Sequence, residues 1–171
     1  MFDGFKYLKR EVGVVITDGA NHIPVKDDVL VVPAEVPGVG PVVAVGDDAF
    51  WLFGILNDAV SEISFPPSVE EIGNDAFANF YRLKTIRFGA GLRLIGDRAF
   101  SDSKLGRLDL PSGVRSIGEN AFVSSPLEFI SLGPSLTNIG SGSFRSAKSV
   151  EIFFSGPPPK ALPMERKPVN G

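Results

Sequence analysis

The chain lacks the residues on which much protein chemistry depends. None of its 171 residues is a cysteine, and it has a single histidine, His22. The absence of cysteine excludes disulfides, zinc fingers, iron–sulfur clusters and thiol catalysis. One histidine leaves little for histidine-based metal sites or catalytic triads. We therefore expect neither a cofactor nor a metal centre.

A surplus of positive charge and long apolar segments are also missing. Seventeen Lys and Arg residues stand against 20 Asp and Glu residues, which gives a formal net charge of −3. Without a basic surplus to neutralise phosphates, nucleic acid is not an expected partner. No apolar run approaches the roughly 18 to 20 residues that span a bilayer. The opening residues, MFDGFKYLKREVG, also lack the apolar core of a secretory signal peptide.

A six-residue signature recurs five times along the chain. The copies are VGDDAF at 45–50, IGNDAF at 72–77, IGDRAF at 95–100, IGENAF at 117–122 and IGSGSF at 139–144. Their glycines are 27, 23, 22 and 22 residues apart. A period of 22–23 residues lies within the range of leucine-rich repeats, in which each repeat forms one coil of a solenoid.

The residue types within each repeat predict its local structure. Segments such as Ile86-x-Phe88 and Leu108-x-Leu110 have the period of two that is typical of a strand with one buried face. The glycine of each signature suits either a positive φ or a tight approach between coils. The Asp, Asn or Glu that follows can cap a short helical turn. The sequence therefore predicts a right-handed, mainly β solenoid with parallel strands and short helical or 3₁₀ turns.

The aromatic residue that ends each signature should lie inside this solenoid. Equivalent residues of stacked coils occupy equivalent depths, so we expect their rings to form one continuous column. The members of this column are Phe50, Phe77, Phe100, Phe122 and Phe144.

At these residues the sequence resembles the BspA-like class of leucine-rich repeats. The hallmark of that class is an I-G-x-x-A-F turn joined to an L-x-x-I-x-I/L-P strand, and the resemblance covers about residues 29–155. Where family repeats often place Cys after the Ala-Phe, this chain has Asn79, Ser103, Ser124 and Ala147. The resemblance implies a bacterial surface or host-interaction protein, secreted or held at the cell surface. The missing signal peptide does not favour export of the chain as it starts.

The two ends of the chain differ from its repeats. Residues 1–28 contain one apolar run, Val12–Ile16, and predict a strand or hairpin that caps the first coil. Residues 29–155 are expected to form the array of five to six coils. Residues 156–171 hold five of the 14 prolines and predict a proline-rich cap or tail. We expect a monomer, with sheet edges at the two ends that are able to pair between chains.

Strand residues that point away from the core form the usual binding face of a solenoid. The repeat register selects two columns of such residues. The first column is Glu62, Thr85, Arg107, Phe129 and Glu151, and the second is Ser64, Arg87, Asp109, Ser131 and Phe153. Arg87 and Asp109 should be neighbours that are able to pair. The two phenylalanines predict a contact with a partner, because outward aromatics are often hot-spot residues; the alternative is that the tail covers Phe153.

Three further motifs are better explained by turns than by chemistry. The segment PGVGPV at 37–42 has only part of a dinucleotide-binding fingerprint, and no long helix follows it. The doublets Asp27-Asp28 and Asp47-Asp48 lack the D-x-D-x-D-G spacing of a calcium loop. His22 lies in a polar stretch, and the chain has no G-x-S-x-G nucleophile motif. Each of these segments is predicted to be a turn.

The outward carboxylates do not predict a catalytic pair. Glu62, Asp109 and Glu151 are two or more coils apart, roughly 10 Å or more at strand spacing, too far to flank one glycosidic bond at retaining distance. The sequence thus predicts a non-enzymatic interaction module that presents its strand face to a protein or a glycan. An architectural spacer within a larger surface protein is the alternative, and a carbohydrate-active β-helix enzyme is the least favoured.

Overall fold

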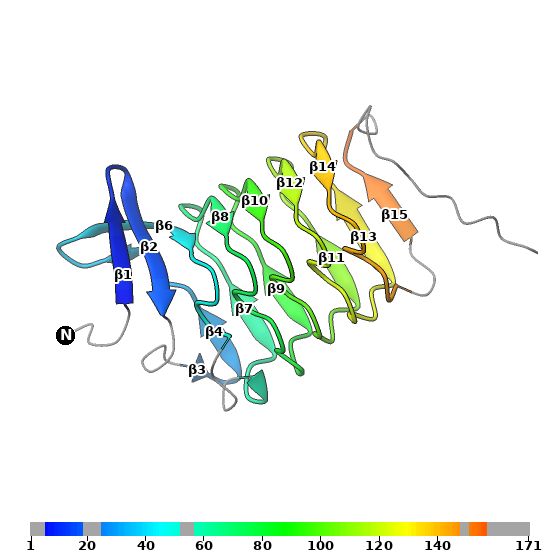
Figure 1. Cartoon of the computed structure of the whole chain (residues 1–171), viewed down its shortest axis with the longest axis horizontal. Coiled ribbons are helices and arrows are strands. Elements are labelled where there is room, and N and C mark those ends of the chain that lie inside the picture. Colours follow the sequence, from blue (N-terminus) through cyan, green and yellow to red (C-terminus); the bar gives the residue numbers. More distant parts are fainter. Residues whose placement is uncertain (1–5, 19–24, 52–56, 148–150, 157–171) are drawn as a thin grey trace, which may run out of the picture.

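The chain winds into a stack of coils along one long axis (Figure 1). The computed structural model describes residues 6–18, 25–51, 57–147 and 151–156. A hairpin of β1 (Lys6–Arg10) and β2 (Gly13–Asp18) lies at one end of the stack, and β15 (Glu151–Phe154) lies at the other. Between them, successive coils place strands on two sides of a common core.

One side of the stack is a continuous sheet of eight strands. Its hydrogen-bonded order is β1-β2-β6-β8-β10-β12-β14, with β5 beside β6. The pairs β1–β2 and β5–β6 are antiparallel, and the other pairs are parallel. The bounds are β5 (Glu35–Val36), β6 (Gly40–Val45), β8 (Glu71–Ile72), β10 (Leu94–Ile95), β12 (Ser116–Ile117) and β14 (Asn138–Ile139).

The opposite side consists of two separate sheets. The first, here the N-terminal block, contains β3 (Val25–Lys26), β4 (Val29–Val31), β7 (Glu62–Ser64) and β9 (Thr85–Arg87). The second, here the C-terminal block, contains β11 (Arg107–Asp109), β13 (Phe129–Leu132) and β15. This architecture confirms the predicted mainly β solenoid of parallel strands. The division into a cap, an array and a tail stays a prediction, and residues 157–171 lie outside the described part.

The turn that carries each signature is tighter than the short helix predicted from the sequence. The second residue after each signature glycine has a left-handed backbone, with φ between 51° and 54° at Asp48, Asp75, Arg98 and Asn120. A left-handed residue ends a helix rather than extending it. The Ala78 N–H, for example, donates to the Asp75 carbonyl at 3.1 Å and closes one turn only.

The signature glycines are required by close approach between coils. None of the five has a positive φ. Of the two explanations for these glycines, a positive φ is therefore wrong, and a tight approach between coils is correct. A Cβ on Gly96 would lie 2.6 Å from the carbonyl carbon of Gly73 and 2.7 Å from the backbone nitrogen of Asn74. Successive coils therefore touch backbone to backbone at this point.

At three of the five signatures the polar residue after the glycine bonds to the next coil. Asp47 Oδ1 accepts the N–H of Asn74 at 2.7 Å, and Asn74 Oδ1 accepts the N–H of Asp97 at 2.8 Å. Asp97 Oδ1 continues the series by accepting the N–H of Glu119 at 2.7 Å. These side chains satisfy backbone donors of the neighbouring coil, which corrects the expectation that each would cap its own turn.

Replacing one side chain in this series tests its contribution to stability. We expect Asp97→Ala to lower the free energy of unfolding by about 1 kcal/mol, since it leaves the Glu119 N–H without its acceptor. Urea denaturation measures the change. The matched control is Glu119→Ala, because Glu119 holds the same signature position and its carboxylate makes no hydrogen bond to the described residues. If the two substitutions lower the free energy of unfolding equally, the hydrogen bond from Glu119 to Asp97 does not stabilise the fold.

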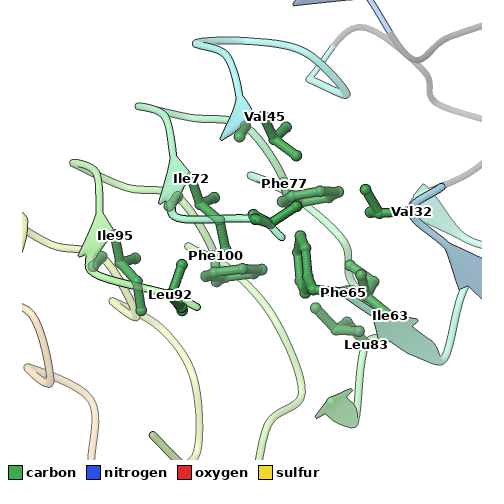
Figure 2. Packing of buried hydrophobic residues seen from close by; sticks show 14 of the residues in the cluster. Val32, Val45, Ile63, Phe65, Ile72, Phe77, Leu83, Leu92, Ile95 and Phe100 are labelled. Carbon is green, nitrogen blue, oxygen red and sulfur yellow. The ribbon is translucent and has the colours of Figure 1, made fainter. Parts of the chain in front are cut away.

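The predicted phenylalanine column is confirmed. Adjacent rings are stacked, with centroids 4.7, 5.4, 5.5 and 5.8 Å apart along the series and interplanar angles of 4° to 13°. Four of the rings are fully buried, and Phe144 at the end is partly buried. Phe65 meets the column edge-on, with its ring at 87° to that of Phe77 (Figure 2).

A seam separates the two blocks of the interrupted side. No strand ladder joins β9 to β11, although a single backbone bond, from Lys104 N–H to the Leu83 carbonyl at 2.8 Å, crosses between them. Leu83 follows Phe77 by six residues, whereas Leu105 follows Phe100 by five. The coil after the seam is therefore one residue shorter between its signature and its strand.

The core also changes its side chains at the seam. Phe80 is fully buried before it, and the equivalent Ser103 and Ser125 are buried after it, with their hydroxyl oxygens 2.6 Å apart. This contact corrects the alignment made from the sequence, because Phe80 and Ser125, rather than Asn79 and Ser124, are the equivalents of Ser103.

Candidate binding face

The outward strand residues form the two predicted rows, interrupted at the seam. In the N-terminal block Glu62 lies opposite Thr85, and Ser64 lies opposite Arg87. In the C-terminal block the aligned residues are Arg107, Phe129 and Glu151 in one row and Asp109, Ser131 and Phe153 in the other. The register is as predicted within each block, while the role of these residues in binding stays a prediction.

Two residues of β4 extend the rows and were missed by the sequence analysis. Val29 pairs in register with Glu62, and Val31 pairs with Ser64. The side chain of Val31 is 56% exposed. The alternation Val29-Leu30-Val31 around the buried Leu30 carries this signal, since it repeats the pattern of the later strands.

The expected pair of Arg87 with Asp109 is wrong, because the seam lies between them. Arg87 instead donates to Glu62 in its own block, and Arg107 donates to both carboxylate oxygens of Asp109, at 2.9 Å for the Nη2–Oδ1 contact. Each hydrogen bond raises the pKa of its arginine above the ordinary value, so both guanidinium groups stay charged. Both outward arginines are thus paired within their own block.

A stack of three planar groups lies on the C-terminal block. The Arg107 guanidinium carbon is 3.7 Å from the centroid of the Phe129 ring, and the Phe129 and Phe153 rings are stacked with centroids 4.8 Å apart. The same guanidinium donates hydrogen bonds to the Asp109 carboxylate. Phe129 is half-buried, and Phe153 is 51% exposed. We call Arg107, Phe129 and Phe153 the aromatic stack; it gives this block a rigid, partly apolar surface.

The motifs interpreted as turns have structural partners. The PGVGPV segment bends between β5 and β6, where the Val39 N–H donates to the Val36 carbonyl at 2.9 Å. Asp27 and Asp28, with φ of 53° and 63°, form the two-residue turn between β3 and β4. His22 lies outside the described residues. Within the described ranges, no cluster of His, Asp and Glu is arranged to hold a metal ion, and no helix is long and apolar enough to cross a membrane.

Solved structures with the same architecture come from several bacteria. A leucine-rich repeat protein of T. pallidum is 31% identical, with a TM-score of 0.71 over 85% of this chain and 67% of that one. One from Bacteroides ovatus is 28% identical, with a TM-score of 0.70 over 88% and 40%. The pneumococcal vaccine antigen PcpA is 25% identical, with a TM-score of 0.59 over 88% and 47%. This chain thus spans less than half of the last two proteins.

A family model for the BspA-type leucine-rich repeat region matches residues 46–157, in six copies. No curated protein matches the chain. The matched segment contains four complete signatures and all but the first residue of the earliest one, together with the phenylalanine column and most of the strand face. Given this match and the shared fold, the chain belongs to the BspA-type leucine-rich repeat proteins.

Proposed function

We propose that the chain is a non-enzymatic interaction module that binds a protein partner through the C-terminal block of its strand face. The observation that carries this proposal is the aromatic stack. Arginine and aromatic residues dominate the energetics of protein contacts, and here an arginine and two phenylalanines lie together on three adjacent strands. Their packing against one another fixes their rotamers, so little conformational entropy is lost on binding.

The same contacts argue against the two alternatives. Two of the three outward carboxylates that an enzyme would use, Glu62 and Asp109, are each engaged in an ion pair with an arginine, and the third, Glu151, stands alone. A spacer needs only a soluble surface, and an aromatic side chain that is 51% exposed does not serve solubility. A protein-binding role accounts for both observations.

Truncation of the central ring tests the proposal. Peptides selected on the wild-type protein from a displayed random library should bind Phe129→Ala at least roughly thirtyfold more weakly, as expected when a hot-spot residue worth about 2 kcal/mol is lost. The matched control is Val31→Ala, because Val31 is exposed on the same face but lies across the seam. Affinities are measured by titration calorimetry, and melting temperatures are compared to verify that both variants fold.

Three outcomes would contradict the proposal. Selected peptides that bind both variants equally well would place the contact elsewhere. Binding to a glycan array that depends on Phe129 would make the partner a carbohydrate. Turnover on a panel of glycosides would make the chain an enzyme.

We also propose that the module acts at a bacterial cell surface. The support is the resemblance of the repeats to a class with many surface members, together with the pneumococcal relative that is described as a vaccine antigen. Antibodies raised against this chain should label intact cells that express it, without permeabilisation. Labelling that appears only after permeabilisation would overturn this part of the proposal.

A further inference from the structure

The strands at the two ends of the described stack each leave one edge free. Among the described residues, the backbone of β1 pairs only with β2, and that of β15 only with β13. Both strands expose apolar side chains: Tyr7 and Leu8 are 40% and 64% exposed on β1, and Ile152 and Phe153 are 37% and 51% exposed on β15. These four residues are nearly half of the nine large exposed apolar residues in the described part of the chain.

A free edge of this kind is a template for another strand. Its unpaired N–H and C=O groups form a ladder with any extended segment of matching side chains. The two edges lie at opposite ends of the stack, so they do not meet within one molecule (Figure 1). Ile152 belongs to the inward row of its sheet, continuing Leu108 and Ile130, and it is exposed because no described strand lies beyond β15.

The charges on the two edges are complementary. On β1, Lys6 pairs with Asp18 at 2.9 Å and Arg10 contacts Glu71 at 3.5 Å, which leaves Lys9 without an ion pair to the described residues. On β15, Glu151 is exposed and likewise has no ion pair with the described residues. Each edge therefore carries one uncompensated charge, of opposite sign.

We propose that β1 of one copy adds to β15 of a second copy as an antiparallel strand, so that molecules associate head to tail. In one register Tyr7 lies opposite Phe153, Leu8 opposite Ile152 and Lys9 opposite Glu151. This register places an aromatic pair and an ion pair on one face and an aliphatic pair on the other, the combinations that stabilise cross-strand neighbours. The contact uses the strand edges and goes beyond the partner-binding role proposed for the strand face.

Other alignments lose these pairs. A shift of one residue moves every side chain to the opposite face and places Lys9 against Ile152 or beyond Glu151. A parallel alignment places Tyr7 opposite Glu151 and Lys9 opposite Phe153, which breaks both the aromatic and the ionic pair. Because the contact joins two different surfaces, each complex keeps one free edge of each kind and grows as concentration rises.

Sedimentation velocity over a concentration series tests the association. The mean mass of the wild-type protein should rise with concentration beyond that of a dimer. Lys9→Glu and Glu151→Lys should each weaken association roughly tenfold, because each replaces an attractive pair by a repulsive one. An equimolar mixture of the two variants should recover wild-type association, since unlike charges then meet at every junction between different variants.

The controls change charge equally at other sites. Lys84→Glu and Glu70→Lys alter exposed residues in the middle of the stack and should leave association unchanged. The proposal is overturned if the wild type remains monomeric at every concentration. It is also overturned if Lys9→Glu associates as the wild type does, or if the mixture of edge variants stays dissociated.

Discussion

Phe100→Ala should lower the free energy of unfolding by about 3–5 kcal/mol. The ring is fully buried and stacked on both sides, with centroids 5.4 Å from Phe77 and 5.5 Å from Phe122. Phe65 and Phe88 also approach it edge-on, at 6.4 and 5.9 Å. Its removal leaves a cavity in the middle of the column, which the backbone contact between coils prevents from collapsing. The loss is a large share of the 5–15 kcal/mol typical of a folded domain.

Urea denaturation of Phe100→Ala and Phe144→Ala measures this effect against a matched control. Phe144 ends the described column, is only partly buried and stacks on one ring, at 5.8 Å. Phe144→Ala should therefore lower the free energy of unfolding clearly less than Phe100→Ala does. A Phe100→Ala variant that melts within about a degree of the wild type would refute the column as the source of stability.

Gly96→Ala is the second substitution with a large expected effect. The added Cβ would lie 2.6 Å and 2.7 Å from backbone atoms of Gly73 and Asn74 in the preceding coil. These atoms are held in place, since the Gly96 N–H donates to the Ile72 carbonyl at 2.8 Å and the Asp97 N–H donates to Asn74 Oδ1. The collision must therefore separate two coils and stretch their hydrogen bonds, and we expect a loss of about 3 kcal/mol.

Gly106→Ala, directly before β11, provides the matched control. A Cβ at Gly106 meets no atom within 4 Å, and this glycine has no positive φ. Alanine there should be neutral, or stabilising by about 0.4–1 kcal/mol, because it restricts the unfolded chain. Thermal melts of the two variants make the comparison. Equal melting temperatures would show that the coils do not press on each other at the signature glycine.

The periodic features of the molecule could be read from its sequence. A repeat of fixed length places equivalent residues at equivalent depths, so five recurring phenylalanines were enough to predict the column and the strand register. The class of turn could not be predicted in the same way. Arg98 adopts a φ of 51° although arginine has no intrinsic preference for it, because stacking on identical turns on either side imposes that conformation.

The irregular features escaped prediction because they depend on departures from the repeat. Arg87 pairs with Glu62 because the seam separates it from Asp109, and the repeat period alone does not show where a strand ladder stops. The sequence placed Arg107 and Phe129 side by side, yet their stacking depends on side-chain rotamers, which periodicity does not specify. The repeat register therefore predicted which residues lie on the strand face, whereas the ion pairs and ring contacts among them came only from the structure.

The seam also has a mechanical consequence. On one side of the rod an unbroken ladder runs from β2 through β14, whereas on the other side the ladder stops between β9 and β11. Amide hydrogens of the two blocks should therefore exchange with solvent as two separately opening units rather than one. A rod that is braced on one side only should bend most easily at the seam, so the segment bearing the aromatic stack should tilt as one unit relative to the rest of the rod.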